Sequence, residues 1–210
     1  MKNRFIFASK YLLMIRKPTD VRQVEIKSAI LAIIFRDGLK KVSTKNIAKE
    51  VGISEGSIFR HFASKNEIIL SIMDDVISGL IESLRRISLE STPPPERLYK
   101  YLCRTITYLV ENKGITILLF SETSYENDER LITKLNNIFN NQKQFAGKIV
   151  SDGIAMGTWD ESISVEDFSS LYMGIPITLN IEMILNKNGF ERVNFCKRMF
   201  DLVLRILEKK

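Results

Sequence analysis

The residues best suited to chemistry stand together, directly after the turn Gly52-Ile53-Ser54. Ile58 and Phe62 lie four positions apart and are predicted to form the buried side of a short helix. The outward side of that helix would then carry Glu55, Gly56, Ser57, Phe59 and Arg60. A short helix of this kind fits the major groove of DNA, where its N-terminal residues reach the base edges.

Two short helices would position these residues, and each follows a serine that can cap it. Ser43 precedes a helix predicted over Thr44–Val51, which Gly52 ends, and Ser54 precedes a helix predicted over Glu55–Phe62. Two helices joined by so short a turn form a helix-turn-helix. Their capped starts point free backbone amides at phosphate groups.

Longer helices are predicted on both sides of this pair. The first covers residues 20–36, with one buried stripe at helical spacing: Ile26, Ala29, Ile30, Ile33 and Ile34. The second follows the capping residue Ser64 and covers residues 65–89. Lys45 and Lys65 would then stand beside the recognition helix, where they can contact the DNA backbone. We call residues 19–64, predicted as one DNA-binding domain, the reader.

The positive charge of the chain is concentrated at this end. Residues 1–65 hold 14 Lys and Arg against five Asp and Glu, whereas residues 66–210 hold 17 against 20, for a net charge of +6 overall. A basic segment joined to a mildly acidic remainder favours a polyanionic partner at one end only. A solvated charged surface would give the same counts.

Few residues elsewhere suit catalysis or metal binding. His61 is the only histidine, and Cys103 and Cys196 stand 93 positions apart without a CxxC spacing. Such cysteines predict neither a disulfide framework nor a zinc site, and they fit a reducing cytoplasm. We find no phosphate-binding loop, nucleophile elbow or dinucleotide-binding glycine motif, so no enzyme, metal or cofactor is predicted.

Helical periodicity continues to the end of the chain, after a break at residues 92–95. The predicted fold is all-α, with a three-helix helix-turn-helix domain followed by a larger helical domain over residues 65–210. The longest uncharged stretch, Phe168–Ile181, is too short and too polar to predict a membrane span. The remaining helices are predicted at residues 96–111, 114–124, 128–153, 165–186 and 190–208.

Residues 1–18 are predicted to be an N-terminal extension. Their basic start and apolar residues imitate a signal peptide, but Lys10 interrupts the apolar run and no cleavage site follows. Translation from Met14 and a short arm or helix ending at Pro18 both remain open.

The stretch from Ile26 to Ile68 resembles the DNA-binding domain of the TetR family of regulators. Residues 47–62 (IAKEVGISEGSIFRHF) match the family's signature almost position for position, and residues 64–68 (SKNEI) match its usual continuation. Phe59 stands where the family usually has tyrosine, which removes a hydroxyl from the phosphate contacts. The helices after the reader resemble the family only in number and length.

The resemblance implies which residues would contact DNA. His61 is expected to be a phosphate or packing residue, and Thr44, Ser57 and Glu55 also suit ordinary helix starts. The full set is Thr44, Lys45, Glu55, Gly56, Ser57, Phe59, Arg60, His61 and Lys65.

The resemblance also implies a homodimer that binds a palindromic DNA operator, and a small, largely apolar effector in the second domain. The last two helices carry apolar stripes that could pair with a second copy or serve the chain's own core. Candidate dimer residues on them include Phe200 and Val203. Candidate effector-binding residues are Tyr101, Thr105, Tyr108, Phe120, Tyr172, Thr178, Asn180 and Met183.

The predicted function is a cytoplasmic, ligand-responsive regulator, and a repressor by the same resemblance. Two alternatives remain: a helical enzyme or carrier, and a small-molecule-binding protein whose reader no longer binds DNA specifically. The basic, intact helix-turn-helix argues against both.

Overall fold

The computed structural model describes residues 18–126, 128–186 and 192–208, and these residues form helices and no strand. Residues 1–17, which make up nearly all of the predicted extension, lie outside them. The elements in order are α2 (Thr19–Asp37), η1 (Leu39–Lys41), α3 (Thr44–Val51), α4 (Glu55–Ile58), α5 (Lys65–Val76), η2 (Ile77–Ile81), α6 (Glu82–Ser88), α7 (Pro94–Glu111), α8 (Ile115–Glu126), α9 (Glu129–Ala155), α10 (Val165–Leu185) and α11 (Arg192–Leu207). The predicted all-α fold class is confirmed.

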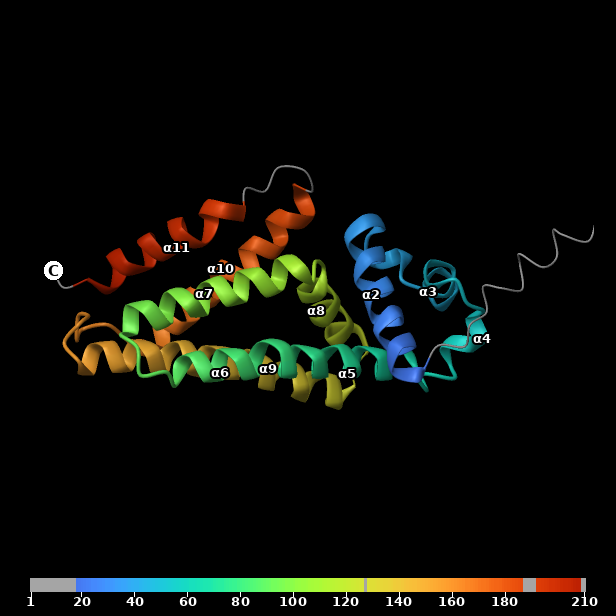
Figure 1. Cartoon of the computed structure of the whole chain (residues 1–210), viewed down its shortest axis with the longest axis horizontal. Helices are drawn as coiled ribbons and strands as arrows, with labels where there is room; N and C mark the ends of the chain where they lie inside the picture. The colour runs from blue at the N-terminus through green and yellow to red at the C-terminus, as the bar shows by residue number, and fades with distance from the viewer. Residues whose placement is uncertain (1–17, 127, 187–191, 209–210) are drawn as a thin grey trace, which may run out of the picture.

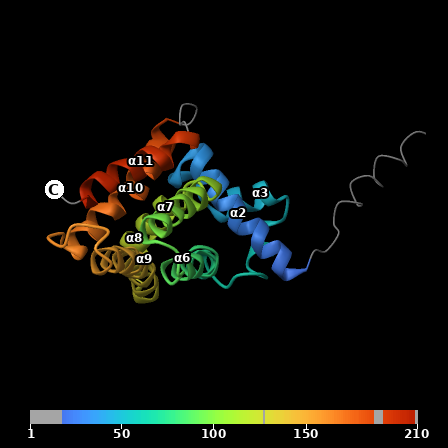
Figure 2. The ribbon, with the colours of Figure 1, turned by 60° about the vertical axis from the view of Figure 1, so that its left-hand side comes forward.

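The molecule is elongated, with α2, α3 and α4 at one end and the end of α11 at the other (Figure 1). Helix α9 is the longest and contacts α5, α6, α7, α8 and α10. Turned by 60°, the ribbon shows α7 lying between α6 and α9 on one side and α11 on the other (Figure 2). One continuous apolar core extends from Ile26 in α2 to Leu207 in α11.

The helix that leaves the reader is continuous from Lys65 to Ser88, as predicted, but its middle is π-helical. Ser64 caps its start by accepting a hydrogen bond from the Glu67 amide at 3.2 Å. The π-helical turn η2 separates the α-helical segments α5 and α6. Such turns widen the helix locally and often lie at functional sites.

Helix α10, with 21 residues, extends beyond the uncharged stretch Phe168–Ile181 at both ends. By length and composition it could cross a membrane, with a mean hydropathy of 1.3 over its most apolar window. A buried core helix meets the same criterion, and α10 packs against α7, α8 and α9. We therefore describe it as a core helix.

The turn after α9 is closed by Trp159, which is 3% exposed. The Gly153 carbonyl accepts hydrogen bonds from the amides of Thr158 at 2.8 Å and Trp159 at 3.3 Å. A Cβ atom at Gly153 would overlap the indole ring of Trp159. Only glycine therefore lets this turn fold back onto the end of α9.

We expect Gly153→Ala to lower the melting temperature by about 2–12 °C, because overpacking costs about 1–3 kcal/mol and each kcal/mol shifts a chain of this size by about 2–4 °C. Thermal unfolding followed by circular dichroism measures it. The control is Ser151→Ala, an exposed position two residues earlier on α9. Equal melting temperatures for both variants would contradict the packing seen at Trp159.

Candidate nucleic-acid interface

The first helix of the reader's helix-turn-helix, α3, begins and ends as its sequence predicts. Ser43 caps α3 by accepting a hydrogen bond from the Asn46 amide at 3.2 Å. Gly52 ends it in the left-handed conformation at φ 74°, which glycine adopts without steric cost. Ile47 and Ala48 then face inward, 2% and 3% exposed.

The recognition helix is shorter than predicted. Regular α-helix covers Glu55–Ile58, and the chain continues to Phe62 through tighter turns, in which the His61 amide donates to the Ile58 carbonyl at 2.9 Å. The prediction that Ser54 caps this helix is wrong: its hydroxyl pairs with the Ser57 hydroxyl at 2.6 Å and not with a backbone amide. Ile58 and Phe62 are buried, as predicted.

The predicted DNA contacts on this helix are exposed. Glu55, Gly56 and Arg60 face solvent, and Phe59 is 53% exposed, which is unusual for a phenylalanine. A Cβ atom at Gly56 would meet no atom within 4 Å, so the protein's own packing does not require glycine there. The surface is open to a partner that approaches the backbone.

Thr44 joins the starts of the two short helices. Its hydroxyl donates a hydrogen bond to Glu55 Oε1. This bond orients the Glu55 carboxylate at the surface. A DNA base that donates to Glu55 would either share the carboxylate with Thr44 or displace the Thr44 hydroxyl. Lys45 is exposed beside this pair, where a DNA phosphate would pass.

His61 has a packing role in this structure. Its carbonyl accepts a hydrogen bond from Gln23 Nε2 of α2 at 2.9 Å. Its Nδ1 atom is buried and has no hydrogen-bond partner among the described residues. The residue therefore ties the end of the recognition segment to α2.

Lys65 is paired inside the protein, which the sequence did not reveal. Its Nζ atom lies 2.7 Å from Oε2 of Glu122 on α8, a carboxylate with a side chain only 7% exposed. The Lys65 side chain is still 41% exposed. An acidic residue in the otherwise uncharged segment 115–124 was the available sequence signal.

Other polar contacts fasten the start of α5 to the second domain. Asn66 Nδ2 donates to Asp128 at 3.1 Å, and Arg130 pairs with Glu67 at 2.8 Å. Hydrogen bonds from the Arg130 side chain and backbone hold the pKa of the Asp128 carboxyl well below its usual range. On α2, Lys27 pairs with Asp75 at 2.5 Å. Of these contacts, the Lys27–Asp75 pair joins the reader to the second domain, beside the apolar core that the two share.

A small apolar cavity lies behind this junction, with a volume of about 70 Å³. None of the described residues that line it carries a charge. Three of the predicted effector-binding residues contribute to its wall: Tyr108, Phe120 and Asn180. Burial raises the pKa of the Tyr108 hydroxyl to about 12, so this group stays neutral at physiological pH.

The other predicted effector-binding residues lie elsewhere. Tyr172 and Thr178 line a separate groove between α10 and α11. Tyr101 is buried in the core, where its hydroxyl donates to the Gln142 carbonyl at 2.8 Å, and Thr105 donates to the Tyr101 carbonyl at 3.0 Å. Met183 is buried and does not line the cavity. Side chains of these types are as common in a helical core as in a ligand site, so the sequence alone did not separate the two.

Asn180 is the polar feature of the cavity. It is 1% exposed, and its Nδ2 atom donates to the Pro176 carbonyl at 2.9 Å. Its Oδ1 atom is buried and accepts no hydrogen bond from any described residue. A buried acceptor without a partner is costly and favours a ligand that donates to it.

The π-helical segment forms another part of the cavity wall. Val76, immediately before η2, and Leu80 within it both line the cavity. The Gly79 carbonyl accepts a hydrogen bond from Arg104 Nη2 at 2.6 Å, and the Arg104 guanidinium lies 5.6 Å from the centre of the Tyr108 ring. The helix that begins at the reader therefore passes directly along the cavity.

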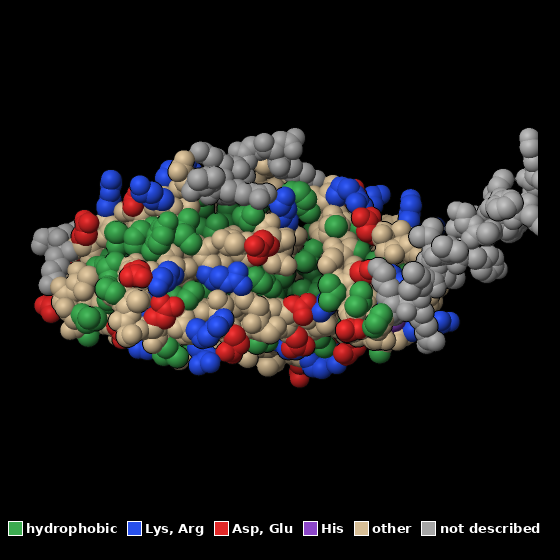
Figure 3. All heavy atoms as spheres, viewed as in Figure 1, with side chains coloured by type: hydrophobic (Ala, Val, Ile, Leu, Met, Phe, Trp, Pro, Cys, Tyr) green, Lys and Arg blue, Asp and Glu red, His purple; other side chains and the backbone are tan. Residues whose placement is uncertain are grey.

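The apolar stripes of the last two helices divide into buried and exposed residues. Val203 is 4% exposed, and Phe200 packs edge-on against Tyr99 of α7 with ring centres 5.0 Å apart. Val203 thus lies in the chain's own core and also lines the groove between α10 and α11, and Phe200 is partly buried against that core. The exposed apolar residues of α10 and α11 are Leu171, Ile181, Leu185, Leu202 and Ile206. Hydrophobic side chains gather along α11 on the surface (Figure 3).

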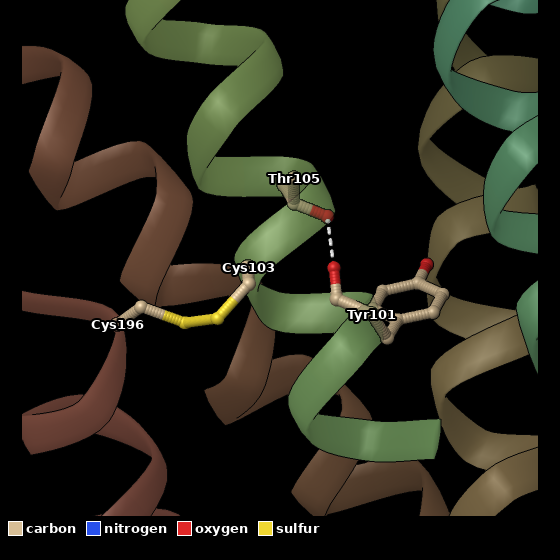
Figure 4. The surroundings of a disulfide bond; sticks show 4 residues. All are labelled: Tyr101, Cys103, Thr105 and Cys196. Carbon is tan, nitrogen blue, oxygen red and sulfur yellow. Dashed lines mark hydrogen bonds between the residues drawn. A yellow bond between two sulfur atoms is a disulfide. The ribbon is translucent and has the colours of Figure 1, made fainter. Parts of the chain in front are cut away.

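The prediction that the two cysteines stay apart is wrong. Cys103 on α7 and Cys196 on α11 form a disulfide, with Cα atoms 5.6 Å apart (Figure 4). Spacing along the chain gave no hint of it, because the pairing depends on how α11 folds back onto α7.

Comparisons with known proteins agree with this geometry. Residues 26–72 match the model of the family described as "Bacterial regulatory proteins, tetR family". The nucleoid occlusion factor SlmA of Vibrio atlanticus is 28% identical over 56% of this chain, a match that spans only 61% of that relative. The fatty acid metabolism regulator protein of Bacillus subtilis is 21% identical over 90% of this chain and 97% of its own length.

The whole fold also has a counterpart among solved structures. The regulator FadR from Bacillus subtilis, in complex with stearoyl-CoA, superposes with a TM-score of 0.67 at 19% identity and covers 86% of this chain and 96% of its own. The helix-turn-helix and the helical domain behind it thus occur together in known regulators. Residues 26–72 of this chain thus match the TetR family of transcriptional regulators, and the helices behind them share the fold of solved regulators.

Proposed function

We propose that the protein is a cytoplasmic repressor that binds a palindromic operator as a homodimer and is released by an effector with a long apolar chain. The observation that carries this proposal is the continuous helix from Lys65 to Ser88. It follows directly after the reader, Lys27 of α2 pairs with Asp75 on it, and its middle forms a wall of the cavity.

The exposed surface of the reader supports DNA binding. Arg60 and Lys45 are exposed cations on neighbouring helices, and Glu55 is oriented at the surface by Thr44. Free amides at the start of α3 add positive potential toward a phosphate. Arg60 suits a base edge or a phosphate, whereas Lys45 suits a phosphate.

Pairing of two copies through α10 and α11 would place two readers on successive major grooves. Leu171 on α10 is 61% exposed, and Leu202 and Ile206 on α11 are 51% and 49% exposed. These residues line a shared open groove of about 430 Å³ between the two helices. Two helices from each copy would bury such residues in a four-helix bundle, the usual arrangement for symmetric pairs.

The cavity supports an effector whose buried part is uncharged and mainly apolar. Its lining offers Asn180 Oδ1 as an unpaired acceptor and no charged partner among the described residues. The structurally similar regulator FadR from Bacillus subtilis was solved in complex with stearoyl-CoA, and an apolar cavity wall can contact an acyl chain of this kind. Ligand cavities usually measure about 300–1,000 Å³, so an acyl chain must separate the surrounding helices as it enters.

That separation would reach the reader through α8. Thr116, Leu119 and Phe120 line the cavity, and Glu122 on the same helix holds Lys65. Displacement of α8 therefore moves or breaks the pair at the start of α5. The distance between the two readers then no longer fits half-sites about 34–36 Å apart.

Arg60→Ala should weaken binding to a duplex selected from a random library by about 1–3 kcal/mol, through loss of a base contact. Lys45→Ala should weaken binding to all duplexes alike. It should also reduce the slope of the logarithm of the binding constant against the logarithm of the salt concentration by about one. Fluorescence anisotropy measures both. Arg86→Ala, an exposed arginine on α6, is the control and should bind like the wild type. Wild-type affinity in all three variants would mean that the reader does not bind DNA in this way.

Leu202→Glu should give a monomer that binds the selected duplex at least about tenfold more weakly, because a buried unpaired charge opposes pairing and one half-site alone holds weakly. Sedimentation velocity at micromolar concentration measures the change. Met156→Glu, at an apolar side chain 68% exposed outside α10 and α11, should stay dimeric. A wild-type monomer, or a Leu202→Glu dimer, would exclude this interface.

Stearoyl-CoA should lower the wild-type protein's DNA affinity by about 5–150-fold, the usual size of an allosteric coupling of 1–3 kcal/mol. Thr116→Phe fills the cavity from its wall and should keep DNA binding while losing this response. Thr133→Phe, an exposed position on α9, is the control. A response retained in Thr116→Phe would place the effector elsewhere.

A further inference from the structure

The disulfide joins the only two cysteines of the chain. Cys103 is half-buried on α7, and Cys196 is 9% exposed on the second turn of α11 (Figure 4). Their Cα separation of 5.6 Å is the usual one for a disulfide, so the bond needs no movement of either helix.

The bond fastens α11 to the rest of the second domain. Of the other helices, α11 packs chiefly on α7. Near Cys196 the contact is the edge-on pair of Tyr99 and Phe200, and at the far end of α11 the Leu207 carbonyl accepts from the Asp160 amide at 3.0 Å. The disulfide therefore holds the N-terminal part of α11, and the Asp160–Leu207 hydrogen bond holds its C-terminal end.

The position of Cys103 also connects the bond to the cavity. The next residue, Arg104, holds the Gly79 carbonyl of the π-helical segment, and Tyr108, one turn further along α7, lines the cavity. Helix α7 thus holds α11 through Cys103 and holds the helix that follows the reader through Arg104. Breaking the disulfide therefore acts on the helix that supports both α11 and the π-helical segment.

We propose that Cys103 and Cys196 form a reversible redox modification site that fixes α11 when oxidised and loosens it when reduced. Its effect on dimerisation and DNA binding rests on the proposed function, because α11 carries Leu202 and Ile206 of the proposed dimer face. Disulfides in a reducing cytoplasm are usually transient and regulatory rather than structural.

The oxidant is a low-molecular-weight disulfide such as oxidised glutathione. The thiolate of the more accessible Cys103 attacks one sulfur, forms a mixed disulfide and releases one small thiol. The Cys196 thiolate then attacks the Cys103 sulfur and releases the second small thiol. Two protein thiols lose two electrons and two protons in total, and the oxidant is reduced to two thiols.

Oxidation should stabilise dimer and DNA complex by ordering α11 before the partner arrives. A loosely held α11 must be immobilised on association, which costs conformational entropy and weakens the dimer. A helix already fixed on α7 presents Leu202 and Ile206 in the same geometry in both copies. The oxidised protein is therefore the tighter binder.

The test equilibrates the full chain in buffers of reduced and oxidised glutathione and counts free thiols with a maleimide reagent. Both thiols should disappear together as the buffer becomes oxidising, and the oxidised form should melt about 4–16 °C higher. Amides of α11 should exchange hydrogen faster in the reduced form of the Leu202→Glu variant, where the dimer does not protect them. Thiols that stay free in every buffer, or equal exchange in both forms, would overturn the site.

The functional arm compares dimer dissociation and DNA affinity of the wild type in both forms. We expect each to be at least about tenfold tighter when oxidised, and Cys103→Ser and Cys196→Ser to behave like the reduced protein in every buffer. Equal dimer and DNA affinities in both forms would overturn the regulatory role. A protein that neither dimerises nor binds DNA in either form would contradict the proposed function and, with it, the regulatory role of the disulfide. The thiol count and the hydrogen exchange would still decide whether Cys103 and Cys196 form a redox site.

Discussion

The structure depends on the helix from Lys65 to Ser88 being one rigid element shared by both domains. Its first turns bury Ile68, Ile69 and Ile72 to 2% exposure or less, and its later part buries Leu84 completely. Because packed helices move largely as units, a shift at the cavity wall is the movement that the proposed function would carry to the reader along this helix. The π-helical turn between them is the one place where its hydrogen-bond register departs from the α-helix, and Arg104 supports it from outside.

The pair of Lys65 and Glu122 determines which movements are allowed. A carboxylate as buried as Glu122 is costly without a partner, so α8 and the start of α5 must move together or expose the acid to water. Under the proposed function, a DNA phosphate that reached Lys65 would share its ammonium group with Glu122. The strength of the Lys65–Glu122 pair would then depend both on bound DNA and on the position of α8.

Local signals predicted most of the fold, and long-range contacts account for what the sequence missed. Ser43, Gly52 and Ser64 act within four residues of themselves, so their roles could be predicted. The pairs Lys65–Glu122 and Cys103–Cys196 form between segments that meet only after folding. Of the predicted effector-binding residues, Tyr108, Phe120 and Asn180 line the cavity because amphipathic residues fill both cores and pockets.

The size and chemistry of the cavity explain why occupancy should switch the protein rather than merely fill a hole. At about 70 Å³ the cavity is too small for an acyl chain, so the closed arrangement is the one that the core prefers when empty. That arrangement keeps the Asn180 Oδ1 atom buried without a donor, a defect that costs about 1–3 kcal/mol. Under the proposed function, a polar group beside the effector's apolar chain would donate to this atom and remove the defect, and that relief is comparable to a typical coupling energy between two sites. The unpaired amide oxygen lies in the same cavity wall as Val76 and Leu80 of the helix that follows the reader.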